Sequence, residues 1–147
     1  MLLDQLRGRA GLAEAGWLED FAEPDAVTAA RRLVDAGARA VVTLPFLVLG
    51  AGHAKSDVPA AVWQVRDAFP TLPVSHGRVL GLHPSLFTLG QRRVEAVAGP
   101  RAAVRERADE VLLVTGAGSS DPDANGDLAK AARFLAECTG HLSLIHI

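Results

Sequence analysis

Apolar residues along the chain recur first at helical spacing and then in short continuous runs. Through residues 24–36 they recur every three or four positions, with Pro24 expected in the first turn of a helix. Residues 40–44 then read AVVTL, a run rich in β-branched side chains. Such a run is typical of a central strand of a parallel sheet, buried on both faces. Pro45 cannot donate to a sheet ladder, so we expect the strand to end there.

The next helix is expected to begin at Asp57. An aspartate carboxylate can cap the first backbone N–H groups of a helix, and Pro59 suits the turn that follows. Apolar residues at helical spacing continue this segment to residue 69. Residues 72–80 then predict a second strand, with a polar interruption at residues 75–76.

The alternation of strands and helices continues toward the C-terminus. Residues 84–97 predict a helix whose Leu86, Leu89 and Val97 face inward, and residues 110–115 predict a third strand of the buried type. A glycine-containing turn and another helix follow that strand. Strands that alternate with helices of this length indicate an α/β fold with a mainly parallel sheet and helices on both faces.

Composition narrows the class of protein. The chain has 147 residues, of which 49% are hydrophobic and 22% charged, with a formal net charge of −2. This length suits the core of one domain, and the charge leaves no basic excess for binding nucleic acid. Cys138 is the only cysteine, which excludes an internal disulfide and favours a reducing, cytoplasmic location. The longest apolar stretch, residues 40–51, is too short to span a bilayer, so we expect no membrane contact.

Chemistry is expected at one edge of the predicted sheet. Ligands of open α/β sheets bind beyond the carboxyl ends of the strands. His53, in the loop after the first strand, and the turn at residues 116–122 both map to that edge. Taken alone, a loop histidine is usually a surface residue. The turn could hold an anion at a helix N-terminus, although it lacks the glycine patterns of nucleotide sites.

Three segments resemble one protein family. Residues 44–59 read LPFLVLGAGHAKSDVP, similar to the strand end followed by G-H-x-x-x-D-[IV]-P in the sirohydrochlorin chelatase family of the CbiX and SirB type. Residues 116–127, GAGSSDPDANGD, resemble the turn that opens the second repeat of longer members. Residues 80–84, LGLHP, resemble a further family segment. The resemblance implies a three-layer chelatase-like fold and an enzyme that inserts a divalent metal into a tetrapyrrole on the pathway to cobalamin or sirohaem.

The resemblance also implies roles for particular residues. His53 would be the metal ligand and the proton acceptor, since a neutral imidazole binds cobalt or iron and has a pKa near physiological pH. Asp57, besides capping its helix, could orient His53 by accepting a ring N–H. The implied substrates are sirohydrochlorin or a related tetrapyrrole and Co²⁺, with Fe²⁺ or Ni²⁺ as alternatives, and no permanently bound cofactor. The other candidate substrate-binding residues are Gly52, Lys55, His83, Ala117, Gly118 and Ser119.

The chain departs from the family pattern in its first repeat. That repeat opens in the family with a strand and a His-Gly-Ser or His-Gly-Thr turn, which nothing before Leu12 supplies. Ala117 stands at the equivalent histidine position of the second repeat. We therefore interpret residues 1–100 as a first repeat without its opening strand, residues 101–109 as a linker and residues 110–141 as the start of the second repeat.

Two further hypotheses concern the C-terminal part. Residues 110–137 could complete the first sheet in a circularly permuted arrangement, which would place strand 111–114 beside strand 41–44. Residues 142–147, LSLIHI, match the translation of a common transposase-adapter DNA sequence, which predicts that the reading frame ran into adapter. A parent gene with a stop codon after Ile147 would contradict that second hypothesis.

Several alternatives stay open at this point. The chain could be a non-catalytic module that holds a tetrapyrrole or a metal, or an α/β module that binds an anion at residues 116–121. His83 suits the start of a helix as well as it suits contact with substrate, and His76 suits a strand end without a role. The oligomeric state is not fixed by the sequence, and a homodimer is one candidate.

Overall fold

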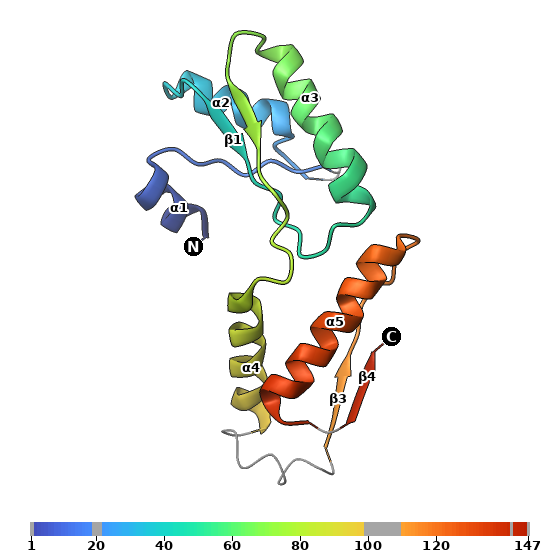
Figure 1. Cartoon of the computed structure of the whole chain (residues 1–147). Coiled ribbons are helices and arrows are strands. Elements are labelled where there is room, and N and C mark those ends of the chain that lie inside the picture. Colours follow the sequence, from blue (N-terminus) through green and yellow to red (C-terminus); the bar gives the residue numbers. More distant parts are fainter. Residues whose placement is uncertain (1, 19–21, 99–109, 142, 147) are drawn as a thin grey trace. The chain divides into compact units, whose positions relative to one another are not determined.

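The computed structural model describes residues 2–18, 22–98, 110–141 and 143–146. Its elements in chain order are α1 (Leu2–Ala10), α2 (Ala26–Asp35), β1 (Val41–Thr43), a π-helical turn η1 (His53–Asp57), α3 (Val58–Ala68), β2 (Val74–His76), α4 (Pro84–Ala98), β3 (Val111–Val114), α5 (Pro122–Thr139) and β4 (Ser143–His146) (Figure 1). The predicted linker at residues 101–109 lies outside the described residues.

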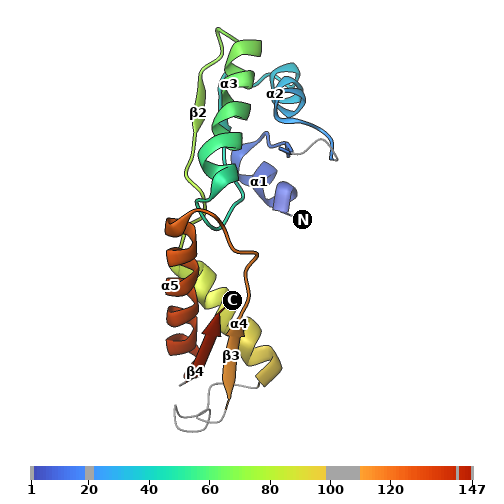
Figure 2. The same ribbon diagram turned by 90° about the vertical axis from the view of Figure 1, so that its right-hand side faces the viewer.

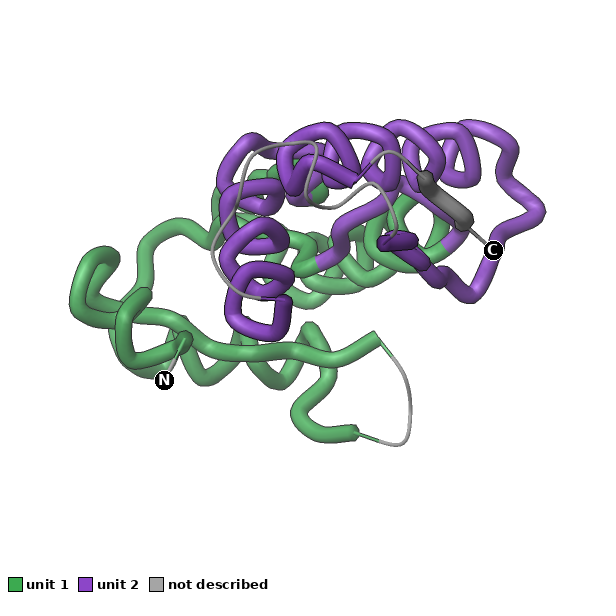
Figure 3. The backbone as a smooth tube through the Cα atoms, turned by 90° about the horizontal axis from the view of Figure 1, so that it is seen from below, with its two compact units in different colours: residues 1–46, 53–79 green, residues 47–52, 80–147 purple. Residues whose placement is uncertain are grey.

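The chain divides into two compact units rather than the single domain that its length suggests. The first comprises Met1–Phe46 with His53–Val79, and the second comprises Leu47–Gly52 with Leu80–Ile147 (Figure 3). Each unit combines helices with a pair of parallel strands, which confirms the predicted α/β class. None of the helices in the described part of the chain is both long and apolar enough to cross a membrane.

The first unit is built on the parallel pair of β1 and β2. Val41 lies opposite Val74, and Thr43 lies opposite His76 at the carboxyl ends of the two strands. The predicted second strand is therefore confined to residues 74–76, and the expected polar interruption lies within it. Its core is formed by apolar side chains of β1, α2 and α3: Ala29, Ala30, Val41, Val58, Val62 and Val65.

The prediction that strand 40–44 is buried on both faces was wrong for this unit. Val41 is buried, but the side chain of Val42 is 63% exposed. Figure 2 shows α2 and α3 to the same side of β2, and the buried residues of both helices belong to this core. A continuous apolar run reports the hydrophobicity of a strand but not which of its alternating side chains is covered.

Asp25 rather than Pro24 marks the beginning of α2. Its backbone is extended (φ −69°, ψ 173°), and its Oδ1 accepts the backbone N–H of Thr28 at 2.6 Å. An extended backbone with a carboxylate that reaches three residues ahead is the geometry of a helix N-cap. These hydrogen bonds, from the backbone and side chain of Thr28 first and then the backbone of Val27, hold the pKa of the Asp25 carboxyl below its ordinary value.

The second unit has its own parallel sheet. Val111–Val114 pairs in parallel with Ser143–His146, in a sheet separate from that of β1 and β2. Within the described residues, strand 111–114 thus has residues 143–146 as its hydrogen-bonded neighbour. The physical reason is local, because α5 connects β3 to the strand that follows it, and a strand–helix–strand unit closes with the shortest crossover.

Helix α4 packs against α5 through a different face from the predicted one. The rings of Phe87 and Phe134 lie edge to face with centroids 5.5 Å apart. A Cβ placed on Gly90 would lie 2.9 Å from a methyl group of Leu135, so the absence of a side chain permits this approach. Leu89 and Val97, which were expected to face inward, are 49% and 91% exposed.

Candidate functional site

His53 opens the π-helical turn that leads into α3. The turn spans His53–Asp57, and α3 continues from Val58 with Pro59 in its first turn. Buried Val58 anchors this end of the helix in the core of the first unit, whereas the side chains of His53 and Asp57 are 60% and 50% exposed. The predicted loop position of His53 is therefore replaced by a helical turn. Single π-helical turns are uncommon and are often found at functional sites.

His53 and Asp57 are hydrogen-bonded to each other. The distance between His53 Nδ1 and Asp57 Oδ2 is 2.5 Å. The expected N-cap by Asp57 is absent, since its backbone is already helical (φ −75°, ψ −40°) and its side chain makes no capping hydrogen bond. Of the two roles raised for Asp57, the geometry therefore favours contact with the histidine ring. In this contact Nδ1 donates when it carries the proton, because an ionised carboxylate can only accept.

Arg66 ties the helix that carries this pair to the neighbouring strand. Its Nη2 and Nε lie 2.9 and 3.3 Å from the backbone oxygen of Val74 and donate to it. The same guanidinium lies 5.2 Å from the ring centroid of Trp63, at the distance of a cation–π contact. These contacts fasten α3 to the start of β2 within the first unit. No local pattern predicts this role of Arg66, because it depends on where the strand lies relative to the helix.

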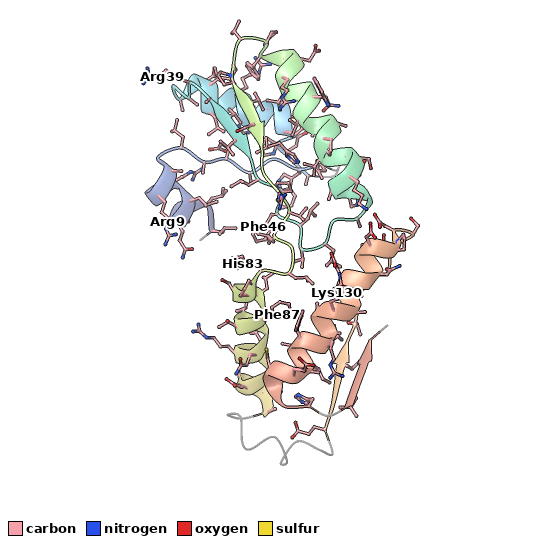
Figure 4. The ribbon with its side chains drawn as sticks, in the orientation of Figure 1. Arg9, Arg39, Phe46, His83, Phe87 and Lys130 are labelled. Carbon is pink, nitrogen blue, oxygen red and sulfur yellow. The ribbon has the colours of Figure 1, made fainter. Side chains whose placement is uncertain are left out.

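The other histidines near strand ends have structural partners. His83 Nδ1 accepts the backbone N–H of Ser85 at 3.2 Å, which places its ring at the start of α4 (Figure 4). His76 is the last residue of β2, and its Nδ1 lies 3.3 Å from Thr43 Oγ1. For His83, the structure thus supplies the helix-starting role that the sequence left open.

The turn before α5 is held by its own side chains. Asn125 Oδ1 accepts the backbone N–H of Ser119 at 3.0 Å, and Asn125 Nδ2 donates to the backbone oxygen of Ser119 at 2.6 Å. The N–H of Asp121 donates to Ser119 Oγ, and the N–H of Asp123 donates to Asp121 Oδ1. Gly118 has a positive φ of 74°, which explains the glycine. Asn125 was not among the predicted site residues, although an Asn side chain can hydrogen-bond to the backbone of a nearby turn and stabilise it.

These hydrogen bonds bear on the anion-binding alternative. An anion at a helix N-terminus binds through backbone N–H groups, but those of Ser119, Asp121 and Asp123 already donate within the turn. The capping carboxylate of Asp121 also places a negative charge where the anion would lie. The geometry therefore disfavours an anion site in this turn.

The predicted site residues fall into two groups. His53, Lys55 and Asp57 share the π-helical turn of the first unit. The remaining candidates belong to the second unit: Gly52, His83, Ala117, Gly118 and Ser119. Among the described residues, no three His, Cys, Asp or Glu side chains gather closely enough to hold a metal ion.

His141 is a buried histidine that no sequence pattern marks. The ring of His141 is 5% exposed, and its Nδ1 lies 2.7 Å from Thr139 Oγ1. Its Nε2 lies 3.4 Å from Glu110 Oε2, so the ring connects the end of α5 to the residue before β3. His141 directly follows Gly140, the residue that ends α5. The local sequence does not distinguish a buried histidine at this position from an exposed one. Its partners assign it to the packing of the second unit.

Comparisons with known proteins agree with the motif that carries His53. The CbiX family pattern matches residues 2–97, more than half of the chain. The sirohydrochlorin cobaltochelatase of Priestia megaterium is 34% identical over 130 residues, which cover 88% of this chain and 42% of that protein. The sirohydrochlorin ferrochelatase of Bacillus subtilis strain 168 is 32% identical over 124 residues, which cover 84% of this chain and 45% of that protein.

Solved structures give the same result for the fold. SirB from Bacillus subtilis with Fe³⁺ superimposes with a TM-score of 0.80 at 27% identity, covering 98% of this chain and 55% of that one. The sirohydrochlorin chelatase SirB of Bacillus subtilis subspecies spizizenii in complex with cobalt has the same fold, with a TM-score of 0.77 at 24% identity over 99% of this chain and 57% of that one.

The fold defines an α/β protein of the same structural class as SirB. The chain belongs to the CbiX family. It spans less than half the length of the curated relatives that it matches.

Proposed function

We propose that the protein inserts a divalent metal into sirohydrochlorin, with His53 as the residue that handles the metal. The observation that carries this proposal is the His53–Asp57 hydrogen bond, formed within the G-H-x-x-x-D-[IV]-P segment by which the chain resembles its family. Relatives described as cobaltochelatase and ferrochelatase support the reaction class. The metal is a substrate here, so no permanently bound cofactor is part of the proposal.

The chemistry of insertion suits an exposed imidazole. The site must bind a hydrated metal ion, release it to the ring nitrogens and accept protons from the two pyrrole N–H groups. Imidazole binds cobalt, iron and nickel less tightly than a thiolate cluster does, so the metal can be released. It can also accept a proton near neutral pH. His53 is 60% exposed on its side chain, which permits a macrocycle to reach it. Lys55, in the same turn, supplies a cation for a peripheral carboxylate of the substrate.

We test the role of His53 with two histidine variants of the whole protein. His53→Ala is expected to lower the rate of Co²⁺ insertion into sirohydrochlorin, followed by absorbance, by about two orders of magnitude or more, in line with the loss of a general acid–base group. His76→Ala, which removes an exposed histidine at a strand end, is the matched control and is expected to retain the rate. Equal rates in the His53→Ala variant and the unchanged protein would refute the assignment.

One observation favours a second candidate, a module that binds tetrapyrrole or metal without inserting it. Ala117 occupies the position where the family resemblance expects a histidine, and this exposed residue brings no ligand or proton acceptor to its turn. Such a module would bind sirohydrochlorin, seen as a shift of its absorbance bands, but would not change the rate of Co²⁺ insertion over the uncatalysed reaction. Catalysed turnover would exclude it.

A further inference from the structure

The geometry of the π-helical turn bears on the orientation of the His53 ring. Asp57 lies four residues after His53, and its Oδ2 is 2.5 Å from the Nδ1 of the ring. The Asp57 side chain makes no capping hydrogen bond to α3, so helix capping does not explain the position of its carboxylate. Both side chains are half exposed or more, so packing does not fix the ring either. The hydrogen bond to Asp57 is a contact that orients the imidazole.

We propose that Asp57 is a positioning residue that holds His53 in the tautomer protonated at Nδ1 and thereby assigns metal binding to Nε2. This inference rests on the proposed function and deepens it. An ionised carboxylate only accepts hydrogen bonds, so contact with it requires the proton on Nδ1. In that tautomer the lone pair of the neutral ring lies on Nε2, and carboxylates that hold the second nitrogen of a ligating histidine commonly fix ring and tautomer in this way.

With Nδ1 hydrogen-bonded to Asp57, His53 has only Nε2 for both of its proposed roles. Metal and pyrrole proton are both expected to bind His53, and Nδ1 is already engaged with Asp57. The two roles proposed for His53 therefore use Nε2 in turn and never together. The metal must leave this nitrogen for the macrocycle before the same nitrogen can take one of the two pyrrole protons, and the other proton passes to water.

The tautomer can be measured directly on the full chain without catalysis. Long-range ¹H–¹⁵N correlation spectra distinguish a protonated from an unprotonated ring nitrogen, and the His53 signals are assigned by their loss in His53→Gln. We expect Nδ1 to be the protonated nitrogen in the unchanged chain. Zn²⁺, a diamagnetic ion that imidazole binds, is expected to shift Nε2 rather than Nδ1.

Variants of Asp57 separate positioning from folding. Asp57→Ala is expected to mix the two tautomers and to weaken Co²⁺ binding, measured by absorbance titration, by about 10- to 100-fold. Asp57→Asn keeps an acceptor oxygen for Nδ1 and is expected to restore the tautomer and part of the affinity. Melting temperatures of both are expected to stay near that of the unchanged chain, because no capping hydrogen bond is lost. Asp67→Asn, an exposed carboxylate on the same helix, is the control for charge.

The outcomes distinguish the two proposals. An unchanged chain with Nδ1 unprotonated, a Zn²⁺-induced shift at Nδ1, or an Asp57→Ala chain with unaltered tautomer and affinity would overturn the role of Asp57. His53 signals that do not respond to metal at all would overturn the proposed metal role of His53, and with it the assignment of metal to Nε2.

Discussion

Two aspartates at helix starts illustrate how the backbone decides the role of a side chain. Asp25 and Asp57 both immediately precede a helix, a position that aspartate commonly caps. Asp25 has an extended backbone (ψ 173°) and caps, whereas Asp57 is already helical (ψ −40°) and binds the ring of His53 instead. The preceding residues make the difference, since a π-helical turn leads into Asp57 and draws it into the helix.

The cap at Asp25 predicts a pH-dependent contribution to stability. Its pKa is lowered in the folded chain by the N–H and side chain of Thr28. A lowered folded pKa means that the contribution is fully present above the unfolded value of about 3.9 and is lost as the pH falls through the folded value. Asp25→Ala is therefore expected to destabilise the chain at neutral pH, and the difference from the unchanged chain is expected to shrink below about pH 4.

Urea unfolding at a series of pH values measures this difference. Asp35→Ala is the control, because it removes a carboxylate from the last residue of the same helix, where no cap is lost. A gap between Asp25→Ala and the unchanged chain that stays constant down to pH values well below the ordinary aspartate pKa would argue against the cap.

At the scale of elements, the sequence predicted where helices and strands lie better than which faces they bury. Periodicity placed α2 and α4 to within a few residues, because the helical repeat is a property of neighbours along the chain. It failed on burial: Val42 and Val97 are exposed although both were expected inside. Coverage of a face depends on which element packs there, and that information lies in distant parts of the chain.

The same substitution at two valines tests this assignment of faces. Val65 on α3 is 1% exposed and belongs to the core of the first unit, whereas Val97 on α4 is 91% exposed. Val65→Ala is expected to lower the free energy of unfolding by about 1–3 kcal/mol, through lost burial and a residual cavity. Val97→Ala is expected to change it by less than about 0.5 kcal/mol. Denaturant unfolding measures both free energies. A larger loss of stability for Val97→Ala than for Val65→Ala would support the sequence-based prediction that Val97 faces inward.

The turn before α5 gives a second element-scale prediction. Asn125→Ala removes both hydrogen bonds to the backbone of Ser119 and is expected to cost about 1 kcal/mol, given that the turn is exposed. Hydrogen exchange of the Ser119 amide is expected to become faster. Lys130→Ala, which removes a surface ion pair with Asp127 on the same helix, serves as the control and is expected to have little effect (Figure 4). An unaltered exchange rate of the Ser119 amide in Asn125→Ala would show that the two hydrogen bonds from Asn125 do not hold the turn.

At the scale of the whole molecule, the sequence could predict the class of fold but not its division. Alternating strands and helices predicted parallel pairing, and both strand pairs are parallel. The pairing partner of β3 could not be predicted, because the choice between β1 and β4 depends on how units close in space rather than on any local pattern. Likewise, the motif identified His53, but the orientation of its ring by Asp57 became visible only with the backbone of the turn.

The choice of metal is the property of the whole protein that its relatives leave open. Cobaltochelatase and ferrochelatase relatives are 34% and 32% identical to the chain, so overall similarity does not separate the metals. Affinity of a nitrogen ligand rises from Fe²⁺ through Co²⁺ to Ni²⁺. An insertion site must bind its metal and then release it, so the intermediate ion is favoured over one held too weakly or too tightly.

We therefore expect the whole protein to insert Co²⁺ faster than Fe²⁺ or Ni²⁺ when each is supplied without oxygen at equal concentration. Initial rates from the absorbance of each metallated product measure the preference, and the uncatalysed rate for each metal is subtracted as the control. His53→Ala is expected to reduce all three rates, because the imidazole is proposed to bind each of these metals before insertion. Faster insertion of Fe²⁺ would show that groups other than this histidine set the preference, since the imidazole alone favours cobalt over iron at equilibrium.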